Sequence, residues 1–423
     1  MHEKLTVKER EEKLLKKYTE YINQFKVFSE RVTELKMFKY AILMKEHILL
    51  KGAPGTAKSM MARAILTNIK DSTVFSQQFT AFMDESYVFG PQLLEEFKKG
   101  KVKHNIKNSL VDCDFAFLDE FFEANEQLIV SCNEVLNERT FTRNFQKETS
   151  GLVTAVITTN RERENEKRLD AVYDRLLFKK SVNPVNKVSN RISMYKNAMA
   201  KSFDTFKPLD FSVLTKLIEL IENKKIKLNE AILKTYDKLL KEFRDQSLKK
   251  VSDRTAIKGL KLLKVSAVLA GRDDINIEDF KNLELILVTD DKEKVIFETE
   301  YAKVKSNLEI LLKSIEKTKK FRSVKAEIDK VVKNRKNEGY KTLSSVKDTI
   351  VEVKEKVLEA VNSLPENSDT DLFDELGDMT DSLEVSRNLI DVEIKNYKKP
   401  DKGEDTDGDN DEGWFDDLVK GGN

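Results

Sequence analysis

The sequence predicts an α/β domain with a largely parallel sheet, followed by helical regions. Between residues 46 and 184, short apolar runs such as "DFAFLDE" and "LVTAVITTN" are separated by stretches with helical periodicity. This alternation is typical of a parallel sheet with helices on its faces. Over residues 185–291, apolar residues recur at three- and four-residue steps, as in "FSVLTKLIELIE", which predicts a second, helical domain.

Helical sequence also flanks these two regions. Residues 1–45 have apolar residues at helical spacing and few helix breakers, so we expect a helical segment leading into the α/β domain. Residues 292–399 are rich in lysine and glutamate and predict long helices, interrupted at Gly339 and broken at Pro365. Residues 400–423 hold nine acidic and two basic side chains, a net charge of −7, and are expected to be a disordered acidic tail.

Composition excludes several classes of protein. Lys and Arg total 75 against 74 Asp and Glu, so the chain has no overall charge that would favour nucleic acid or a membrane surface. We find no apolar signal segment and no window of about 18 uncharged apolar residues, so neither export nor a membrane span is expected. Cys113 and Cys132 lie in apolar stretches without metal-ligand spacing and are expected to be reduced core residues, which favours a cytoplasmic protein.

A loop of small residues, "GAPGTAKS", joins an apolar run to a helical stretch. Gly52 and Gly55 allow a tight turn whose amide groups can point at phosphate oxygens, and the next helix directs its positive end to the same charge. Lys58 is then placed to reach the β- and γ-phosphates of ATP, and the hydroxyl of Ser59 to hold Mg²⁺. The residues expected to contact the nucleotide are Gly52, Ala53, Pro54, Gly55, Thr56, Ala57, Lys58, Ser59 and Met60.

Ala57 departs from the usual form of this loop, in which glycine precedes the lysine. An alanine can enter a helix without strain when its φ is negative. The sequence therefore predicts a negative φ at Ala57 and a loop that still binds phosphate.

Polar residues end two of the expected strands. Asp119 and Glu120 close "DFAFLDE", and a strand end beside a phosphate loop is where a carboxylate that orients magnesium must lie. We expect Ser59 and Asp119 to form the metal site and Glu120 to act as the general base toward water. Asn160 ends "LVTAVITTN", where its amide would hydrogen-bond both the γ-phosphate and the water, although an asparagine there is equally suited to a turn.

Together these motifs resemble the AAA+ ATPases, and within them the MoxR group, closest to its RavA-like branch. The resemblance spans about Val27 to Leu287 and is carried by "HILLKGAPGTAKS", "DFAFLDE", "NEVLNERTF", "VITTN", "LDAVYDRLL" and "VSDRTAIKGLKLLKVSAVLAGRDDI". It implies an α/β P-loop NTPase core over residues 46–184, an α-helical lid domain over 185–291 and a helical C-terminal extension over 292–399.

The resemblance also implies cofactors, assembly and roles. It implies ATP and Mg²⁺, and a hexameric ring with nucleotide bound between neighbouring subunits. Asn160 is implied as sensor 1, Arg175 as the arginine finger that reaches a neighbour's γ-phosphate, and Arg254 as the sensor 2 arginine acting within its own subunit. Arg139 is a further candidate for a contact between subunits. The alternative for each arginine is a solvated surface charge.

The function implied is that of an ATP-hydrolysing, chaperone-like remodeller of a protein client, acting with a partner that carries a von Willebrand factor A domain. The alternative is a nucleotide-dependent scaffold or switch with little turnover. Glu120, Asn160 and Arg175 favour hydrolysis, since a pure binding module has no need of a carboxylate that polarises water. A nucleic-acid motor is disfavoured by the balanced charge.

One short motif in the acidic segment suggests an interaction. In "GWFDDL", Trp414, Phe415 and Leu418 form an apolar cluster among acidic residues. Aromatic anchors in acidic segments can dock into a groove of a partner and fold as they bind. Docking to a partner is one hypothesis for this motif; the alternative is that it packs on its own chain or on nothing.

Overall fold

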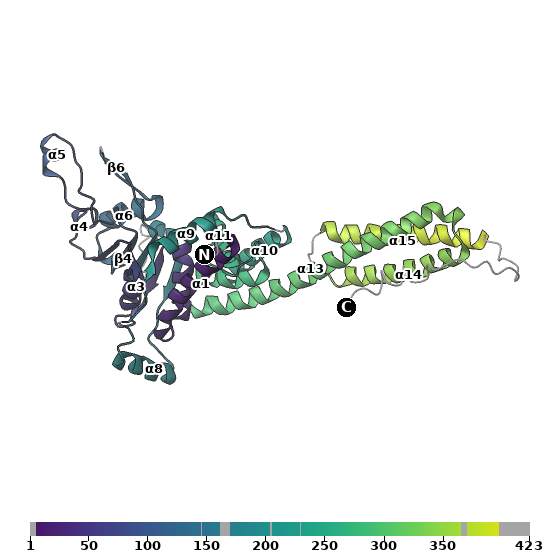
Figure 1. The fold of residues 1–423 in the computed structure, drawn as a ribbon, viewed down its shortest axis with the longest axis horizontal. Helices are drawn as coiled ribbons and strands as arrows, with labels where there is room; N and C mark the ends of the chain where they lie inside the picture. The colour runs from purple at the N-terminus through teal and green to yellow at the C-terminus, as the bar shows by residue number, and fades with distance from the viewer. Residues whose placement is uncertain are drawn as a thin grey trace, which may run out of the picture. The chain divides into compact units, whose positions relative to one another are not determined.

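The computed structural model describes residues 6–144, 146–160, 170–203, 205–228, 230–364 and 370–396. The chain divides into two compact units, residues 1–301 and residues 302–423 (Figure 1). Each unit is described by itself below. The acidic segment 400–423 lies outside the described residues.

A five-stranded parallel sheet forms the centre of the first unit, as the sequence predicts. Its strand order is β3 (Val74–Gln78), β4 (Phe115–Asp119), β7 (Thr154–Thr159), β1 (Ile48–Lys51) and β8 (Phe178–Ser181). Because all five strands run the same way, their carboxyl ends meet at one edge of the sheet. That edge carries the polar residues which the sequence analysis selected.

Helices cover the faces of this sheet (Figure 1). The first four residues of β4, "FAFL", are apolar and buried, and all six residues of β7 are apolar or hydroxyl side chains that are buried, since helices exclude water from both faces. One apolar cluster joins Ala116, Leu118 and Ile157 of the sheet to Leu128 and Cys132 of a helix. The helices next to the sheet in sequence are α2 (Val32–Met44), α3 (Lys58–Thr67), α4 (Ser86–Phe89), α5 (Leu94–Lys98), α6 (Glu126–Glu138) and α7 (Asp170–Arg175).

Two small sheets were not predicted. β5 (Thr140–Arg143) and β6 (Gln146–Thr149) form an antiparallel pair. β2 (Ile69–Lys70) pairs in parallel with β9 (Leu209–Asp210). Both sheets are made of very short strands, and their sequences lack the apolar runs that marked the central sheet.

The rest of the first unit is helical. α1 (Val7–Asn23) begins with a capping box in which Thr6 and Glu9 exchange hydrogen bonds, and η1 (Gln24–Val27) follows it. α8 (Val188–Met199) follows the last strand of the central sheet. The helices of the second, helical region are α9 (Phe211–Asn223), α10 (Glu230–Ser247), α11 (Asp253–Leu269), η3 (Ile277–Leu283) and α12 (Glu284–Leu287).

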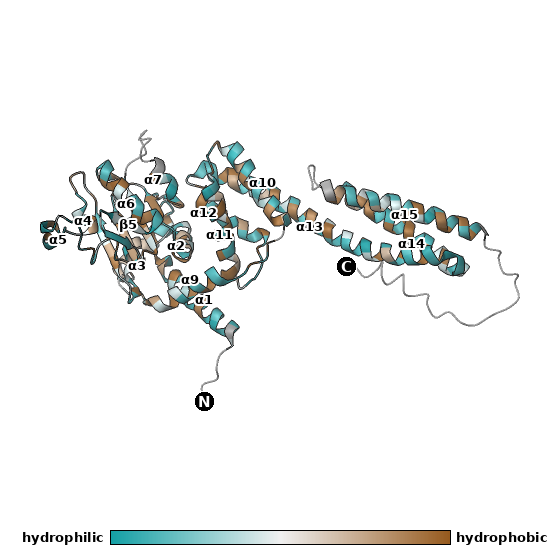
Figure 2. Ribbon diagram, turned by 90° about the horizontal axis from the view of Figure 1, so that it is seen from above, coloured by the Kyte–Doolittle hydropathy of each residue, from teal (hydrophilic) through white to brown (hydrophobic). Residues whose placement is uncertain are grey.

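Long helices make up the C-terminal region of the described chain, as predicted. They are α13 (Asp291–Asn334), the short η4 (Arg335–Asn337), α14 (Tyr340–Asn362) and α15 (Thr370–Asn396). Apolar and hydrophilic residues alternate along α14 and α15 (Figure 2). Their apolar residues form one core with the end of α13, in which Ile328, Leu343, Ile350 and Leu383 are fully buried.

The two cysteines are buried, unpaired thiols, as expected. Burial raises the pKa of Cys113 to about 12 and raises that of Cys132 still further. Both thiols are therefore protonated and unreactive at neutral pH. Among the described residues, no helix combines the length and apolar character that crossing a bilayer requires.

Candidate functional site

The loop "GAPGTAKS" connects β1 to α3 at the carboxyl edge of the central sheet. Gly52 donates its amide hydrogen to Thr159 O of β7 (3.1 Å), which fixes the start of the loop to the neighbouring strand. A Cβ atom on Gly52 would lie 2.3 Å from the carbonyl oxygen of Val182, so only glycine fits there. Gly55 has a φ of 80°, where glycine is also favoured.

Ala57 is the N-cap of α3 and has a φ of 64° and a ψ of 15°. The prediction of a negative φ is therefore wrong. Ala57 takes the left-handed conformation that glycine adopts without penalty, because the loop must turn sharply before Lys58 starts the helix. For a residue with a Cβ atom this conformation costs about 1–2 kcal/mol, so the loop stores local backbone strain.

Replacing Ala57 with glycine is expected to raise the free energy of unfolding by about 0.5–1 kcal/mol, because glycine relieves the left-handed strain at the cost of extra unfolded-state entropy. Urea denaturation followed by circular dichroism measures this change. Ala64→Gly is the matched control, since Ala64 lies inside α3 and the same change there lowers stability by about 1 kcal/mol. Equal losses in the two variants would contradict the strain at Ala57.

Lys58 is almost fully buried, and its ammonium group lies inside the loop. Its Nζ atom donates to Gly52 O (2.5 Å), Ala53 O (2.9 Å) and Asn160 Oδ1 (3.1 Å). Burial lowers the pKa of Lys58, and the nearby carboxylates of Glu120 and Asp119 oppose that shift. The loop therefore presents a cation among backbone groups, which is the chemistry that binds a polyphosphate.

Ser59 and Asp119 face each other across the edge of the sheet. Ser59 Oγ lies 3.3 Å from both carboxylate oxygens of Asp119. Thr158 of β7 also donates a hydrogen bond to Asp119, and it accepts one from the backbone N–H of Glu120 (3.3 Å). A hydroxyl and a carboxylate are the oxygen donors that Mg²⁺ prefers, so these residues fit the expected metal.

Glu120 and Asn160 are held together at the same edge. The backbone N–H of Asn160 donates to Glu120 Oε2 (3.0 Å), and the side-chain amide nitrogen of Asn160 donates to Oε1. Glu120 has a φ of 52°, a second left-handed residue at this site. The side-chain amide of Asn160 thus bridges the ammonium of Lys58 and the carboxylate of Glu120.

The sequence analysis missed Thr158 and Arg31. Arg31 is buried, and its Nη2 atom donates to Thr56 O of the loop (3.0 Å) and to Asn183 O after β8 (2.7 Å). It therefore ties the loop to two other segments. For Arg31, the only signal in the sequence was its position just before an apolar helix. For Thr158, the only signal was its position in "TTN" at the end of a strand, which is similarly weak.

A cavity of about 240 Å³ opens beside the loop. Arg31, Gly55, Thr56, Ala57 and Met60 line it on one side. The other lining residues are Phe28, Ser29, Pro184, Val185, Arg191, Met194 and Phe203. Its wall is mainly apolar, with two arginines, and it adjoins the phosphate-binding loop.

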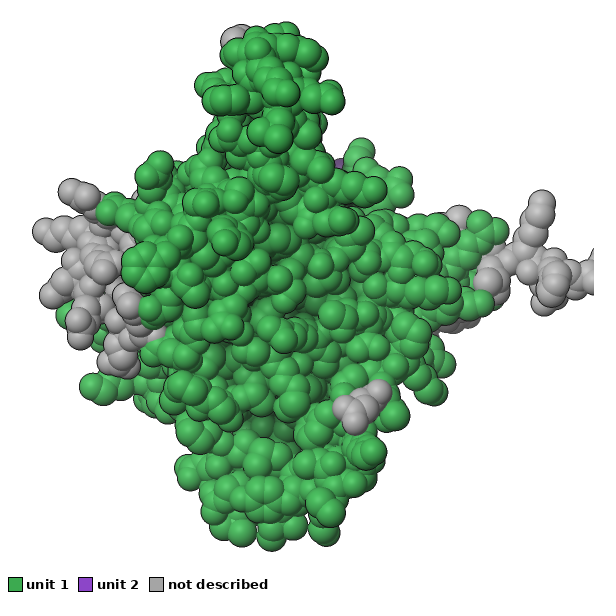
Figure 3. All heavy atoms as spheres, turned by 90° about the vertical axis from the view of Figure 1, so that its left-hand side faces the viewer, with its two compact units in different colours: residues 1–301 green, residues 302–423 purple. Residues whose placement is uncertain are grey.

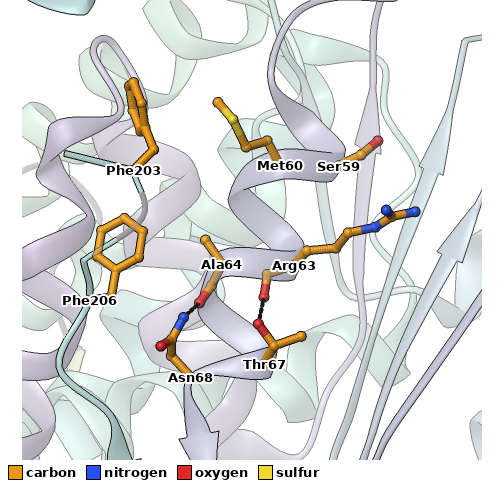
Figure 4. Close-up of a pocket in the computed structure, with 8 residues that line it drawn as sticks. All are labelled: Ser59, Met60, Arg63, Ala64, Thr67, Asn68, Phe203 and Phe206. Atoms are coloured by element: carbon orange, nitrogen blue, oxygen red, sulfur yellow. Dashed lines mark hydrogen bonds between the residues drawn. The ribbon is translucent and has the colours of Figure 1, made fainter. Parts of the chain in front are cut away.

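A second hollow of about 450 Å³ lies along α3 and shares Met60 and Phe203 with the first (Figure 4). Phe203 and Phe206 face α3 across it, and these rings pack on Phe28 and Phe25, with centroids 5.1 and 4.5 Å apart. The aromatic wall is therefore anchored to the segment that precedes α2. The remaining lining residues are Ser59, Arg63, Ala64, Thr67 and Asn68.

The two arginines expected to act on the γ-phosphate lie on the helices α7 and α11. Arg175 is the last residue of α7 and is half-buried. Arg254 is the second residue of α11, is exposed, and follows Ser252, which caps the helix by accepting from Thr255 N–H (3.3 Å). In the described part of the chain, no hydrogen bond or ion pair joins either arginine to the residues around Lys58.

Arg139, the further candidate for a contact between subunits, bonds within its own chain. Its guanidinium donates to Lys45 O (2.8 Å), Val153 O (3.4 Å) and Leu136 O, and it lies beside the ring of His47. Burial lowers the pKa of Arg139 to about 10. These contacts tie the end of α6 to the segments that precede β1 and β7, which is a structural role.

Two family models match parts of the chain. Residues 13–200 match the model described as the MoxR domain in the MoxR-vWA-beta-propeller ternary systems. Residues 217–299 match the AAA lid domain. The two matches support a MoxR-type AAA+ ATPase with its lid domain. The second match ends within α13 and does not reach α14 or α15.

Two curated relatives from Methanocaldococcus jannaschii are similar over most of their length. Uncharacterized protein MJ0079 is 29% identical over 322 residues, which is 74% of this chain and 81% of the relative. Uncharacterized protein MJ0812 is 28% identical over 365 residues, 82% of this chain and 93% of the relative. A crystal structure from Cytophaga hutchinsonii, described as a "putative ATPase", has a TM-score of 0.55 and is 20% identical. The match covers 69% of this chain and 95% of that chain, and it supports the fold alone.

Proposed function

We propose that this chain hydrolyses ATP as a ring-forming ATPase of the RavA-like branch of the MoxR group, and that it remodels a protein client in the cytoplasm. The partner we propose carries a von Willebrand factor A domain. The family model is described from systems that combine MoxR, vWA and β-propeller proteins, which supports this choice. The client is a protein whose identity the chain does not specify.

One observation carries this proposal: Lys58, Ser59, Asp119, Glu120 and Asn160 form a connected set at the carboxyl edge of three adjacent strands. Lys58 binds the β- and γ-phosphates, with the loop amides around it. Glu120 accepts a proton from the attacking water, and the amide of Asn160 orients this water and the γ-phosphate. Phosphoryl transfer needs positioning and charge more than covalent chemistry, and this set supplies both.

Ser59 and Asp119 would hold Mg²⁺, Asp119 through water. When held there, Mg²⁺ would supply positive charge that offsets the negative charge of the phosphates. Thr158 keeps the Asp119 carboxylate in place and fixes the backbone of Glu120 at the same time. One hydroxyl group thus contacts the carboxylate of Asp119 and the backbone of Glu120, two residues with different proposed roles.

The cavity beside the loop would receive the adenine base. Its position next to Gly55, Thr56 and Ala57 places it at the end of the phosphate-binding loop. Apolar side chains such as Phe28 and Met194 offer the flat, dry surface that a purine needs. Arg31 connects this cavity to the loop through Thr56.

The test is steady-state ATP hydrolysis per subunit over a range of protein concentrations. We expect turnover per subunit to rise with concentration, because Arg175 is proposed to act in a neighbour's site. ATP binding without turnover at every concentration would instead favour the nucleotide-dependent scaffold or switch. Salt-sensitive DNA binding that stimulates turnover would favour a nucleic-acid motor.

A further inference from the structure

α8 carries an apolar face that the described residues leave exposed. Val188 is 61% exposed, Ile192 47%, Tyr195 57% and Met199 88%. Their spacing of four, three and four residues puts them on one side of the helix. In Figure 1, α8 lies at the lower end of the first unit, and the space-filling view of Figure 3 shows a lobe at the same end.

The opposite side of α8 is attached to the rest of its unit. Asn190 Nδ2 donates to Glu30 Oε1 (2.8 Å), and Asn197 Nδ2 donates to Val27 O (3.2 Å). Met194 lies between these two asparagines in sequence and lines the cavity beside the loop. The helix is therefore attached to its unit by the inner side, and its outer side is an exposed apolar patch in a fixed position on that unit.

α8 and the residues next to it in sequence carry only basic charge, while the carboxylate of Glu30 accepts hydrogen bonds at the start of the helix. Residues 184–203 contain four basic side chains, Lys187, Arg191, Lys196 and Lys201, and no acidic one. Lys196 and Lys201 are exposed. An apolar stripe with basic neighbours fits an acidic segment that has apolar anchors.

The chain contains a segment of this kind. Residues 401–423 carry nine acidic and two basic side chains, a net charge of −7, and include Trp414, Phe415 and Leu418. The charges of this segment and of the region around α8 are complementary, and both have large apolar side chains to bury. Burial of such anchors against a helix face is a common way to bind a peptide.

We propose that α8 is the docking surface for residues 401–423 of a second copy of this chain. Trp414, Phe415 and Leu418 contact the stripe formed by Val188, Ile192, Tyr195 and Met199. The acidic residues around them pair with Lys196 and Lys201. Because Arg191 and Met194 of the same helix line the cavity beside the loop, docking connects the acidic segment of one copy with the nucleotide site of another.

The first test uses Trp414, which is the chain's only tryptophan. Tryptophan emission of the full chain, excited at a wavelength that its ten tyrosines do not absorb, therefore reports the surroundings of this segment alone. We expect its emission to move to shorter wavelength as protein concentration rises, since docking removes the indole from water. The double variant Ile192→Asp and Tyr195→Asp should lose this shift. Val130→Asp is the matched control, because Val130 is 54% exposed on α6, and it should keep the shift.

The second test reverses the charge of selected side chains and leaves the residues of the apolar stripe unchanged. A fluorescently labelled peptide of residues 401–423 is titrated with the full chain, and its anisotropy is measured. Lys196→Glu with Lys201→Glu should weaken binding at least about tenfold. A peptide with Asp416→Lys and Asp417→Lys should regain binding to that variant. Circular dichroism of each variant verifies that it is folded.

Three outcomes would overturn the proposal. The first is a tryptophan emission that does not change with protein concentration. The second is peptide binding that is insensitive to both sets of α8 substitutions. The third is a change of oligomeric state in the α8 variants with unaltered tryptophan emission, which would assign the stripe to a contact between folded subunits. None of these measurements requires hydrolysis, so they separate this proposal from the proposed ATPase function.

Discussion

Replacing Glu120 with glutamine is expected to lower ATP turnover per subunit by about 10²–10⁴-fold while ATP binding is retained. The amide keeps the size of the side chain but has no carboxylate to take a proton from water. The loop residues that bind phosphate are unchanged, so affinity for ATP should stay close to that of the wild type. Phosphate release measures turnover, and a fluorescent ATP analogue measures binding.

Glu138→Gln is the matched control for this variant, since Glu138 is an exposed residue at the end of α6. It should have wild-type turnover. Unchanged turnover in Glu120→Gln would exclude Glu120 as the general base. Loss of binding together with turnover would mean that the substitution disturbs the hydrogen bonds to Asn160, and Glu120 would then be a structural residue of the loop.

Replacing Arg175 with alanine is expected to lower turnover by about 10³–10⁵-fold, because an arginine finger stabilises charge on the transferring phosphoryl group. If the finger comes from a neighbour, a mixture of Arg175→Ala and Glu120→Gln subunits should recover part of the activity. In such a mixture, a site with an intact Glu120 can receive an intact Arg175 from the adjacent subunit. The recovery is measured as phosphate release at constant total protein and varied subunit ratio.

Arg244→Ala is the control for loss of an exposed arginine, since Arg244 lies on α10. It should leave turnover unchanged. A mixture that stays inactive at every ratio, from subunits that still assemble, would contradict donation between subunits. Full activity of Arg175→Ala alone would show that the arginine is a surface charge, the alternative reading of this residue.

Much of the fold follows from patterns that are local in the sequence. The two strands in the middle of the sheet order, β4 and β7, are runs of buried residues because helices cover both faces, and the apolar "FAFL" of β4 shows this most clearly. The β5–β6 hairpin was missed because Thr140–Arg143 and Gln146–Thr149 are short and largely polar. β2 and β9 were missed for a different reason: each has only two residues, and their pairing depends on the tertiary fold.

The site residues also divide into those that local sequence patterns reveal and those that depend on the tertiary fold. Lys58, Ser59, Asp119, Glu120 and Asn160 were found because each ends or follows a recognisable element, and parallel strands bring those ends to one edge. Arg31 could not be placed, because its role depends on the carbonyl oxygens of Thr56 and Asn183, which are remote in sequence. The φ of Ala57 was mispredicted because closure of the loop outweighs the intrinsic preference of alanine.

The amide of Asn160, which bridges Lys58 and Glu120, has a consequence for the proposed catalytic cycle. When a phosphate engages Lys58 and Asn160, it replaces hydrogen bonds that these residues already make within the chain. Binding is therefore an exchange of partners, and its net gain is smaller than the sum of the new contacts. The same internal bonds re-form as the product leaves, so they lower the cost of product release and favour repeated turnover over tight retention of the product.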